Sequence, residues 1–269
     1  MQFYFDCGLP RSGSTLLTAI LNQNPDIYAG VISPVLELME DADFILTKEP
    51  AITFPKPYIF NSIIKSNIIN YYSDKVEPII IDKSRMWPRY IDLIKKYITP
   101  NPKLICTVRH PLETLASFIT LIHENKGVSY VDKALTEFGY EINDDNRCHI
   151  LMEPDGIITK AIKALEYAYK NNQSHHVHII QYDDLVSKPT EVMNQLHEFL
   201  ELDQFDYSFN NIKAIEREDD EHYGIPKMHE VRQEIKKISK PYTEVLSKQV
   251  IEQYKEWDPI LPLKLLEAV

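Results

Sequence analysis

Four short apolar runs recur along this chain, and each is bounded by turn residues and followed by a stretch whose apolar residues have helical spacing. The runs lie at 2–8, 78–82, 103–109 and 176–182. The expected helices are 14–23, 34–42, 58–72, 88–98, 111–123, 157–171, 189–201 and 242–256. Strands that alternate with helices form a parallel sheet with helices on both faces. The pattern therefore predicts a three-layer α/β fold, and a length of 269 residues favours one domain spanning 1–269.

The composition disfavours one class of partner. Hydrophobic residues make up 44% of the chain and charged residues 26%, so there is enough apolar side chain to bury a central sheet. The formal net charge of −11 repels polyanions at long range. We therefore expect no nucleic-acid partner, and an anionic ligand would need a local cluster of cations and backbone N–H groups.

Cysteine usage and the absence of long apolar runs indicate the compartment. Cys7, Cys106 and Cys148 are far apart and form no C-x-x-C pair, which predicts neither a disulfide framework nor a zinc site. The first residues lack the basic and apolar regions of a secretory signal, and no run approaches the roughly 18 apolar residues that span a bilayer. We expect a cytoplasmic protein with no membrane segment and no bound metal.

A loop flanked by two glycines follows the first apolar run. It reads Gly-Leu-Pro-Arg-Ser-Gly-Ser-Thr over residues 8–15, and an apolar helical stretch comes next. In this context backbone N–H groups point into the loop, the helix N-terminus carries partial positive charge, and serine and threonine hydroxyls add donors. The loop matches the Walker A pattern G-x-x-x-x-G-K-[ST], except that Ser14 replaces the lysine and Arg11 places a cation inside the loop. The arrangement favours an oxyanion as ligand.

The loop resembles the 5′-phosphosulfate loop of sulfotransferases that use 3′-phosphoadenosine 5′-phosphosulfate (PAPS), a family with a P-loop NTPase-like fold. The family pattern is G-x-P-R-[ST]-G-[ST]-[ST] after the first strand. The resemblance implies that the 5′-phosphosulfate end of PAPS is bound by Arg11, Ser12, Gly13, Ser14 and Thr15.

A second motif follows the third apolar run, where Arg109, His110 and Pro111 lead from the strand into a helix. Arg109 is thereby directed to the carboxyl edge of the sheet, where open α/β folds bind ligands. A planar guanidinium can make bidentate bonds to phosphate. The segment resembles the R-[DNH]-P-x(5)-S element of the same family, which implies that Arg109 and Ser117 grip the 3′-phosphate of PAPS.

Two weaker matches support the same assignment. Residues 182–189, from Tyr182 to Pro189, are similar to a Y-[ED]-D-L-x-x-x-P segment at the nucleotide pocket of the family. Residues 223–232 cluster cations where the family has a loop that closes over the cofactor. The resemblance adds Tyr182, Lys227, His229 and Arg232 to the predicted cofactor-binding residues.

Sulfuryl transfer needs a base for the acceptor proton and cations that stabilise the departing phosphate. The second apolar run delivers Asp82 to the sheet edge beside Lys83 and Arg85, and it looks like the E-K-[ST] element of carbohydrate sulfotransferases. We therefore predict Asp82 as the base, with Lys83 and Arg11 as electrostatic partners. Asp82 could instead cap the next turn, and His110 and His229 are alternative bases.

Two rival functions stay open. The run that ends at Asp82 also fits a Walker B strand, which would suit a kinase that uses ATP and Mg²⁺, although the Walker lysine is missing. A catalytically inactive protein that binds adenosine 3′,5′-bisphosphate (PAP) is the non-enzymatic alternative. The acceptor would be a small molecule, carbohydrate or peptide, held by cover segments near 28–75, 124–160 and 203–240. Loops of this kind carry no residue code that identifies the acceptor or the oligomeric state.

Overall fold

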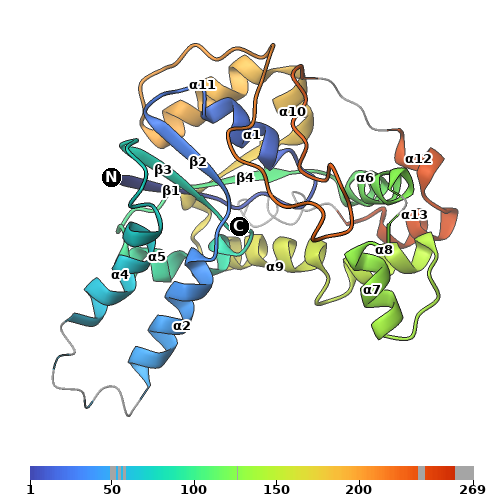
Figure 1. The fold of residues 1–269 in the computed structure, drawn as a ribbon, viewed down its shortest axis with the longest axis horizontal. Coiled ribbons are helices and arrows are strands. Elements are labelled where there is room, and N and C mark those ends of the chain that lie inside the picture. The colour runs from blue at the N-terminus through green and yellow to red at the C-terminus, as the bar shows by residue number, and fades with distance from the viewer. Residues whose placement is uncertain (49–52, 54–55, 57–58, 126, 236–239, 258–269) are drawn as a thin grey trace.

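The computed structural model describes the chain except for residues 49–52, 54–55, 57–58, 126, 236–239 and 258–269. Its centre is a parallel sheet with the strand order β2-β3-β1-β4-β5 (Figure 1). The strands are β1 (Gln2–Asp6), β2 (Ile27–Ile32), β3 (Ile79–Lys83), β4 (Leu104–Val108) and β5 (Val177–Gln181). Because every pairing is parallel, the carboxyl ends of the strands meet at one edge.

Helices cover both faces of this sheet, which confirms the predicted α/β fold. Side chains alternate along each strand, so that Tyr4 of β1 faces one layer and Phe5 the other. The first layer contains α1 (Ser14–Leu21), α10 (Tyr182–Ser187) and α11 (Pro189–Leu200). The second contains α4 (Phe60–Tyr71), α5 (Ile91–Tyr97) and α9 (Ile157–Lys170).

Further helices lie beyond the carboxyl end of β4, at the right of Figure 1. They are α6 (Pro111–Glu124), α7 (Tyr130–Glu137), α8 (Asp144–Met152), α12 (Tyr242–Val245) and α13 (Lys248–Tyr254). Two short 3₁₀ turns, η2 (Trp87–Tyr90) and η3 (Ser174–His176), complete the described helical elements. No helix in the described part of the chain is long and apolar enough to serve as a bilayer-crossing segment.

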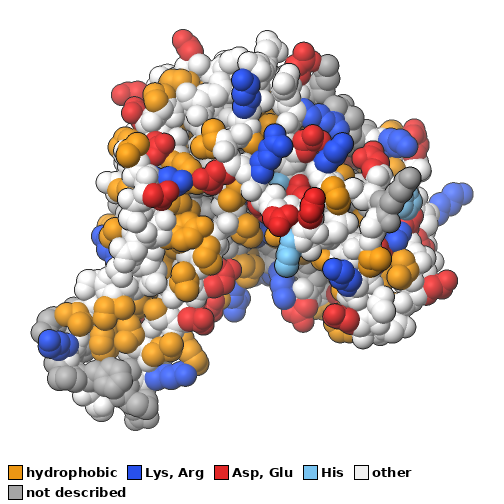
Figure 2. Space-filling view, in the orientation of Figure 1, with side chains coloured by type: hydrophobic (Ala, Val, Ile, Leu, Met, Phe, Trp, Pro, Cys, Tyr) orange, Lys and Arg blue, Asp and Glu red, His pale blue; other side chains and the backbone are white. Residues whose placement is uncertain are grey.

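The helix α2 (Val35–Thr47) packs along α4, and the two project from the body of the molecule. Hydrophobic side chains are exposed on this projection, including Leu38, Phe44 and Ile45 of α2 and Ile63 of α4 (Figure 2).

The structure differs from the sequence-based expectation at two elements. The segment 28–75, expected as an acceptor cover, contains strand β2, whose Tyr28 and Ala29 are buried in the core. The expected helix 242–256 is two helices, because Leu246 has extended backbone angles and the Ser247 hydroxyl caps a new start by accepting a hydrogen bond from the Val250 N–H.

Candidate active site

The first loop has close backbone packing that only glycine allows. A Cβ on Gly8 would lie 2.2 Å from Thr107 Oγ1 of β4. Gly13 has a φ of 92° and a Cβ there would meet the Tyr182 ring at 2.9 Å. L side chains rarely adopt this φ, so both spacing and backbone require glycine. The loop is thereby held against the ends of β4 and β5, with α1 beginning at Ser14.

The N-terminus of α1 is open to a ligand. Gly13, at the N-cap, offers no side-chain hydrogen bond, and the first turn contains no acidic residue. Gly13, Ser14 and Thr15 line the cavity described below. Helix N-terminal N–H groups and the helix dipole together favour an anion at this position.

Ser12 has a different placement from these three. Its side chain is completely buried, and Oγ donates to the Leu9 carbonyl at 2.6 Å. The Thr107 hydroxyl lies 2.6 Å from the same oxygen. Since the Ser12 hydroxyl hydrogen is used within the loop, this side chain fixes the loop to β4, and Ser12 is absent from the cavity lining.

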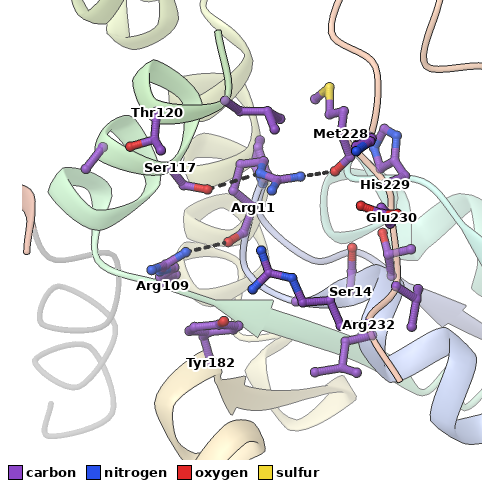
Figure 3. Close-up of a pocket in the computed structure, with 18 of the residues that line it drawn as sticks. Arg11, Ser14, Arg109, Ser117, Thr120, Tyr182, Met228, His229, Glu230 and Arg232 are labelled. Atoms are coloured by element: carbon purple, nitrogen blue, oxygen red, sulfur yellow. Dashed lines mark hydrogen bonds between the residues drawn. The ribbon is translucent and has the colours of Figure 1, made fainter. Parts of the chain in front are cut away.

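A cavity of about 540 Å³ extends from the N-terminus of α1 to α6 and to the segment 227–235 (Figure 3). Predicted residues from five separate motifs line it together, namely Arg11, Gly13, Ser14, Thr15, Lys83, Arg109, Ser117, Tyr182, Lys227, His229 and Arg232. Arg85 and Thr120 also line it. The two main sequence motifs therefore share one cavity, as required if one nucleotide bridges them.

Arg109 and Arg11 lie side by side in this cavity. Arg109 Nη1 donates to the Arg11 carbonyl oxygen at 3.3 Å, and Arg11 Nε donates to Ser117 Oγ at 3.3 Å (Figure 3). Arg11 also donates to the Met228 carbonyl of the cover segment. The Arg11 side chain therefore extends toward the Arg109–Ser117 pair and not only along its own loop.

The charges in this cluster are poorly compensated. Burial, followed by repulsion from Arg109, lowers the pKa of Arg11 to about 10. Arg109 pairs with Glu113 at 3.2 Å and lies over the Tyr182 ring, 4.4 Å from its centroid. Its Nη2 is buried and has no hydrogen-bond partner among the described residues. Buried donors are normally paired, so an unpaired guanidinium nitrogen next to a second arginine fits an anionic group.

The segment 216–232 crosses this end of the sheet, and it is held at several points. The Tyr130 N–H of α7 donates to the Tyr223 carbonyl at 2.9 Å, and Gly224 approaches Val128 so closely that a Cβ would meet its carbonyl oxygen at 2.2 Å. Ile225 is fully buried. Lys227, His229 and Arg232 follow these anchors and reach the cavity.

Lys83 ends β3 on the same sheet face as Asp6, its register partner on β1. Its side chain is only 7% exposed and lines the cavity. Burial lowers the pKa of Lys83, and the nearby Asp6 carboxylate partly offsets that effect. A buried ammonium with lowered pKa at the ligand-binding edge is suited to contact an anionic ligand.

Asp82, the residue before Lys83, faces the opposite layer. It is fully buried and accepts hydrogen bonds from Ser33, from Tyr72 Oη at 2.7 Å and from Trp87 Nε1 at 2.7 Å. It is not among the residues that line the cavity. This geometry does not support the prediction that Asp82 is the base, since its oxygens are occupied by donors from the residues that directly follow β2 and α4 and from η2.

His110, an alternative base, is also placed outside the cavity. Its Nδ1 accepts a hydrogen bond from the Leu112 N–H at 3.2 Å, so it caps α6. Its ring stacks on Tyr242 with the centroids 6.4 Å apart. His229 does line the cavity, and two acidic residues that the sequence did not single out, Glu218 and Asp220, lie beside it. Both lie in a run of charged residues whose sequence looks like that of any solvent-exposed loop, so the sequence carried no signal for them.

Comparisons with known proteins identify the family and the fold. A family model described as the sulfotransferase family matches residues 5–207. Among solved structures, mouse sulfotransferase SULT7A1 complexed with PAP has a TM-score of 0.57 and 12% identity, covering 99% of this chain and 88% of that chain. Retinol dehydratase in complex with androsterone and the inactive cofactor PAP has a TM-score of 0.50 and 11% identity, covering 97% and 82%. At these identities the likeness concerns the fold alone. No curated protein sequence gives a significant match.

Proposed function

Because this chain belongs to the sulfotransferase family, we propose that it transfers the sulfuryl group of PAPS to a hydroxyl or amine of a small-molecule, carbohydrate or peptide acceptor. The observation that supports the choice of donor is a pair of adjacent arginines, of which Arg109 is buried. Arg109 Nη2 has no hydrogen-bond partner in the described part of the chain, and Arg11 and Ser117 lie beside it. The 3′-phosphate on the ribose distinguishes PAPS from ATP and adenosine 5′-monophosphate, and this cluster offers it charge-assisted bonds.

The two ends of the cavity suit the two anionic ends of the donor. We assign the 3′-phosphate to Arg109, Ser117 and Arg11. We assign the 5′-phosphosulfate to the N-terminus of α1, with Gly13, Ser14 and Thr15 as donors and Lys83 as the cation. Ser12 contributes by fixing the loop, since its hydroxyl is bonded within it. Tyr182 supports the site by packing on Gly13 and under Arg109.

Bound PAPS would supply the sulfuryl group and a phosphate leaving group. The residues of this chain would orient it and stabilise the charge that develops as the phosphate departs. Lys83 is the cation at the strand end for this task, and Arg11 links the first loop to the cover segment through Met228. Lys227 and Arg232 add cations from that segment. Fixed cations of this kind are among the largest contributors to transfer reactions.

The test is a comparison of ligands by thermal unfolding of the wild-type chain. A ligand at 100 times its dissociation constant stabilises the folded state by about 2.7 kcal/mol, which for a chain of this size raises Tm by about 5–10 °C. We expect that rise with PAP, a smaller one with adenosine 5′-monophosphate, and no dependence on Mg²⁺. If PAP leaves the Tm unchanged and ATP with Mg²⁺ raises it, the result would favour a kinase instead. Consumption of radiolabelled PAPS, with label appearing in an acceptor, then separates an enzyme from an inactive binding protein.

A further inference from the structure

Asp6 is a buried carboxylate at the end of β1, directly before the first loop. Its side chain belongs to a residue that is only 3% exposed. Oδ1 accepts a hydrogen bond from the Gly8 N–H at 3.1 Å, so this oxygen fixes the start of the loop. Oδ2 is also buried, and it has no hydrogen-bond partner among the residues that the structure describes. A buried carboxylate oxygen without a partner is costly, so its presence at this position needs an explanation.

The sheet register places Lys83 beside this carboxylate. Asp6 and Lys83 are Cα partners on the neighbouring parallel strands β1 and β3, so both side chains stand on the same face of the sheet. The strands are also joined next to this pair, since the Ser84 N–H donates to the Asp6 carbonyl at 3.0 Å. The short Asp6 side chain stays in the core, whereas the longer Lys83 side chain lines the cavity. Asp6 therefore lies behind Lys83 as seen from the cavity.

The other charged and titratable groups near Lys83 come from the end of β3 and from the segment 216–232. Arg85, two residues after Lys83, repels the ammonium, and Glu218 attracts it. His229 is the remaining titratable neighbour. Burial lowers the pKa of Lys83, and Asp6 opposes this shift more strongly than Glu218 does. The carboxylate that the register places beside Lys83 is thus also its strongest attractive charge.

The surroundings of Asp6 lead to the same pair. Burial raises the pKa of Asp6, and Lys83 is the strongest of the groups that oppose this shift, ahead of the Gly8 N–H and Arg85. Asp82 faces the opposite layer and adds a weaker repulsion. The carboxylate of Asp6 and the ammonium of Lys83 therefore keep each other charged at a position where burial alone would neutralise both.

We propose that Asp6 is the positioning residue of Lys83, and that it holds the ammonium charged and directed at the phosphosulfate of the donor. This inference rests on the proposed sulfuryl transfer. A charged Lys83 stabilises the negative charge that the departing phosphate gains, which a neutral amine would not do. Asp6 does not line the cavity, so it contacts neither donor nor acceptor and acts through Lys83.

The first test measures the charge of Lys83 directly and needs neither donor nor acceptor. Lysine side chains are labelled with ¹³C at Cε, and the NMR signal of Lys83 is assigned by its absence from the spectrum of Lys83→Met. In Asp6→Asn the amide oxygen can still accept the Gly8 N–H, so the substitution removes the charge and keeps the loop contact. The midpoint of the Lys83 titration should fall by about one pH unit or more in this variant. Asp26→Asn, the same substitution at an exposed position before β2, is the matched control and should leave the midpoint unchanged.

The second test measures the effect of that charge on the reaction, with water as the acceptor. Release of inorganic sulfate from radiolabelled PAPS is followed between about pH 7 and pH 10.5. A water oxygen bonds to sulfur and gives its protons to solvent, while the electron pair of the broken S–O bond stays on the phosphate of PAP. The wild-type rate should fall at alkaline pH as Lys83 loses its proton. In Asp6→Asn this fall should begin about one pH unit lower, which a purely structural role would not produce.

A double-mutant cycle shows whether Asp6 acts through Lys83. At a pH between the two midpoints, Asp6→Asn should slow sulfate release by up to about tenfold in the wild-type background and should have no further effect in Lys83→Met. The affinity of Asp6→Asn for PAP at neutral pH should stay within about threefold of the wild type, because the loop contact is kept.

Three results overturn the proposal. The first is a Lys83 titration with the same midpoint in the wild type and in Asp6→Asn. The second is equal slowing by Asp6→Asn with and without Lys83. The third is loss of PAP binding by Asp6→Asn at neutral pH, which would show that Asp6 serves the folding of the loop. Failure of the wild type to bind PAP is a separate outcome that refutes the proposed donor, and the NMR titration still decides whether Asp6 keeps Lys83 charged.

Discussion

Replacement of Arg109 by alanine should remove the preference for PAP over adenosine 5′-monophosphate. Arg109 has one buried nitrogen with no partner among the described residues and another that donates only to the Arg11 carbonyl, so both can turn to a phosphate. Each charge-assisted bond contributes about 1.5–3 kcal/mol. Since Arg109 must give up part of its present bonding, we expect a net loss of about 3 kcal/mol, which is about 10²-fold in the dissociation constant.

The measurement is calorimetric titration of both nucleotides into the wild type and the variant. The affinity for PAP should fall about 10²-fold while the affinity for adenosine 5′-monophosphate changes by less than about threefold. Arg109→Lys should lie between the two, because an ammonium keeps the charge and loses the planar fork. Arg89→Ala is the matched control, since Arg89 is exposed on η2 and is not part of the cavity lining. Equal weakening of both nucleotides by Arg109→Ala would refute the assignment of the 3′-phosphate to this residue.

Other consequences of the structure can be checked on single variants. Gly13→Ala should lower stability by about 1–3 kcal/mol and abolish PAP binding, measured by urea unfolding and calorimetry, because φ is 92° and the new Cβ would meet Tyr182. Asp82→Ala should lower Tm by about 6–12 °C, because it leaves the buried Trp87 N–H and the other two donors without an acceptor, at a cost of about 3 kcal/mol. The affinity for PAP should not change. A normal Tm together with lost turnover would instead indicate that Asp82 takes part in catalysis. Lys83→Met should slow PAPS breakdown by about 10²–10³-fold with a smaller effect on PAP affinity. Burial raises the pKa of Cys7 well above its usual value and that of Cys148 to about 12, so a thiol reagent should label neither at mildly alkaline pH until the chain unfolds.

The sequence predicted the fold well where hydrophobic runs were continuous. The four runs at 2–8, 78–82, 103–109 and 176–182 correspond to β1, β3, β4 and β5. The missed strand β2 follows Pro25 and Asp26 and contains Gly30, which are residues that usually indicate a turn. The local sequence of β2 does not favour a strand, and the extended conformation is stabilised by pairing with β3.

The site could be predicted to the level of motifs, because the carboxyl ends of neighbouring parallel strands meet at one edge. Which of two consecutive residues faces the ligand could not be predicted. Asp82 and Lys83 point to opposite faces of β3, and the register that pairs Lys83 with Asp6 decides which one reaches the cavity. The placement of His229 depends on Asp220, nine residues earlier in a segment without regular structure, so no periodicity could reveal it.

The most direct measurement is a crystal structure of this chain with PAP. The account predicts that the 3′-phosphate lies within hydrogen-bond distance of Arg109 and Ser117, and that the 5′-phosphate lies on the backbone N–H groups of Gly13, Ser14 and Thr15 with Lys83 nearby. PAP bound outside this cavity, or bound in it with the 3′-phosphate away from Arg109, would contradict the account.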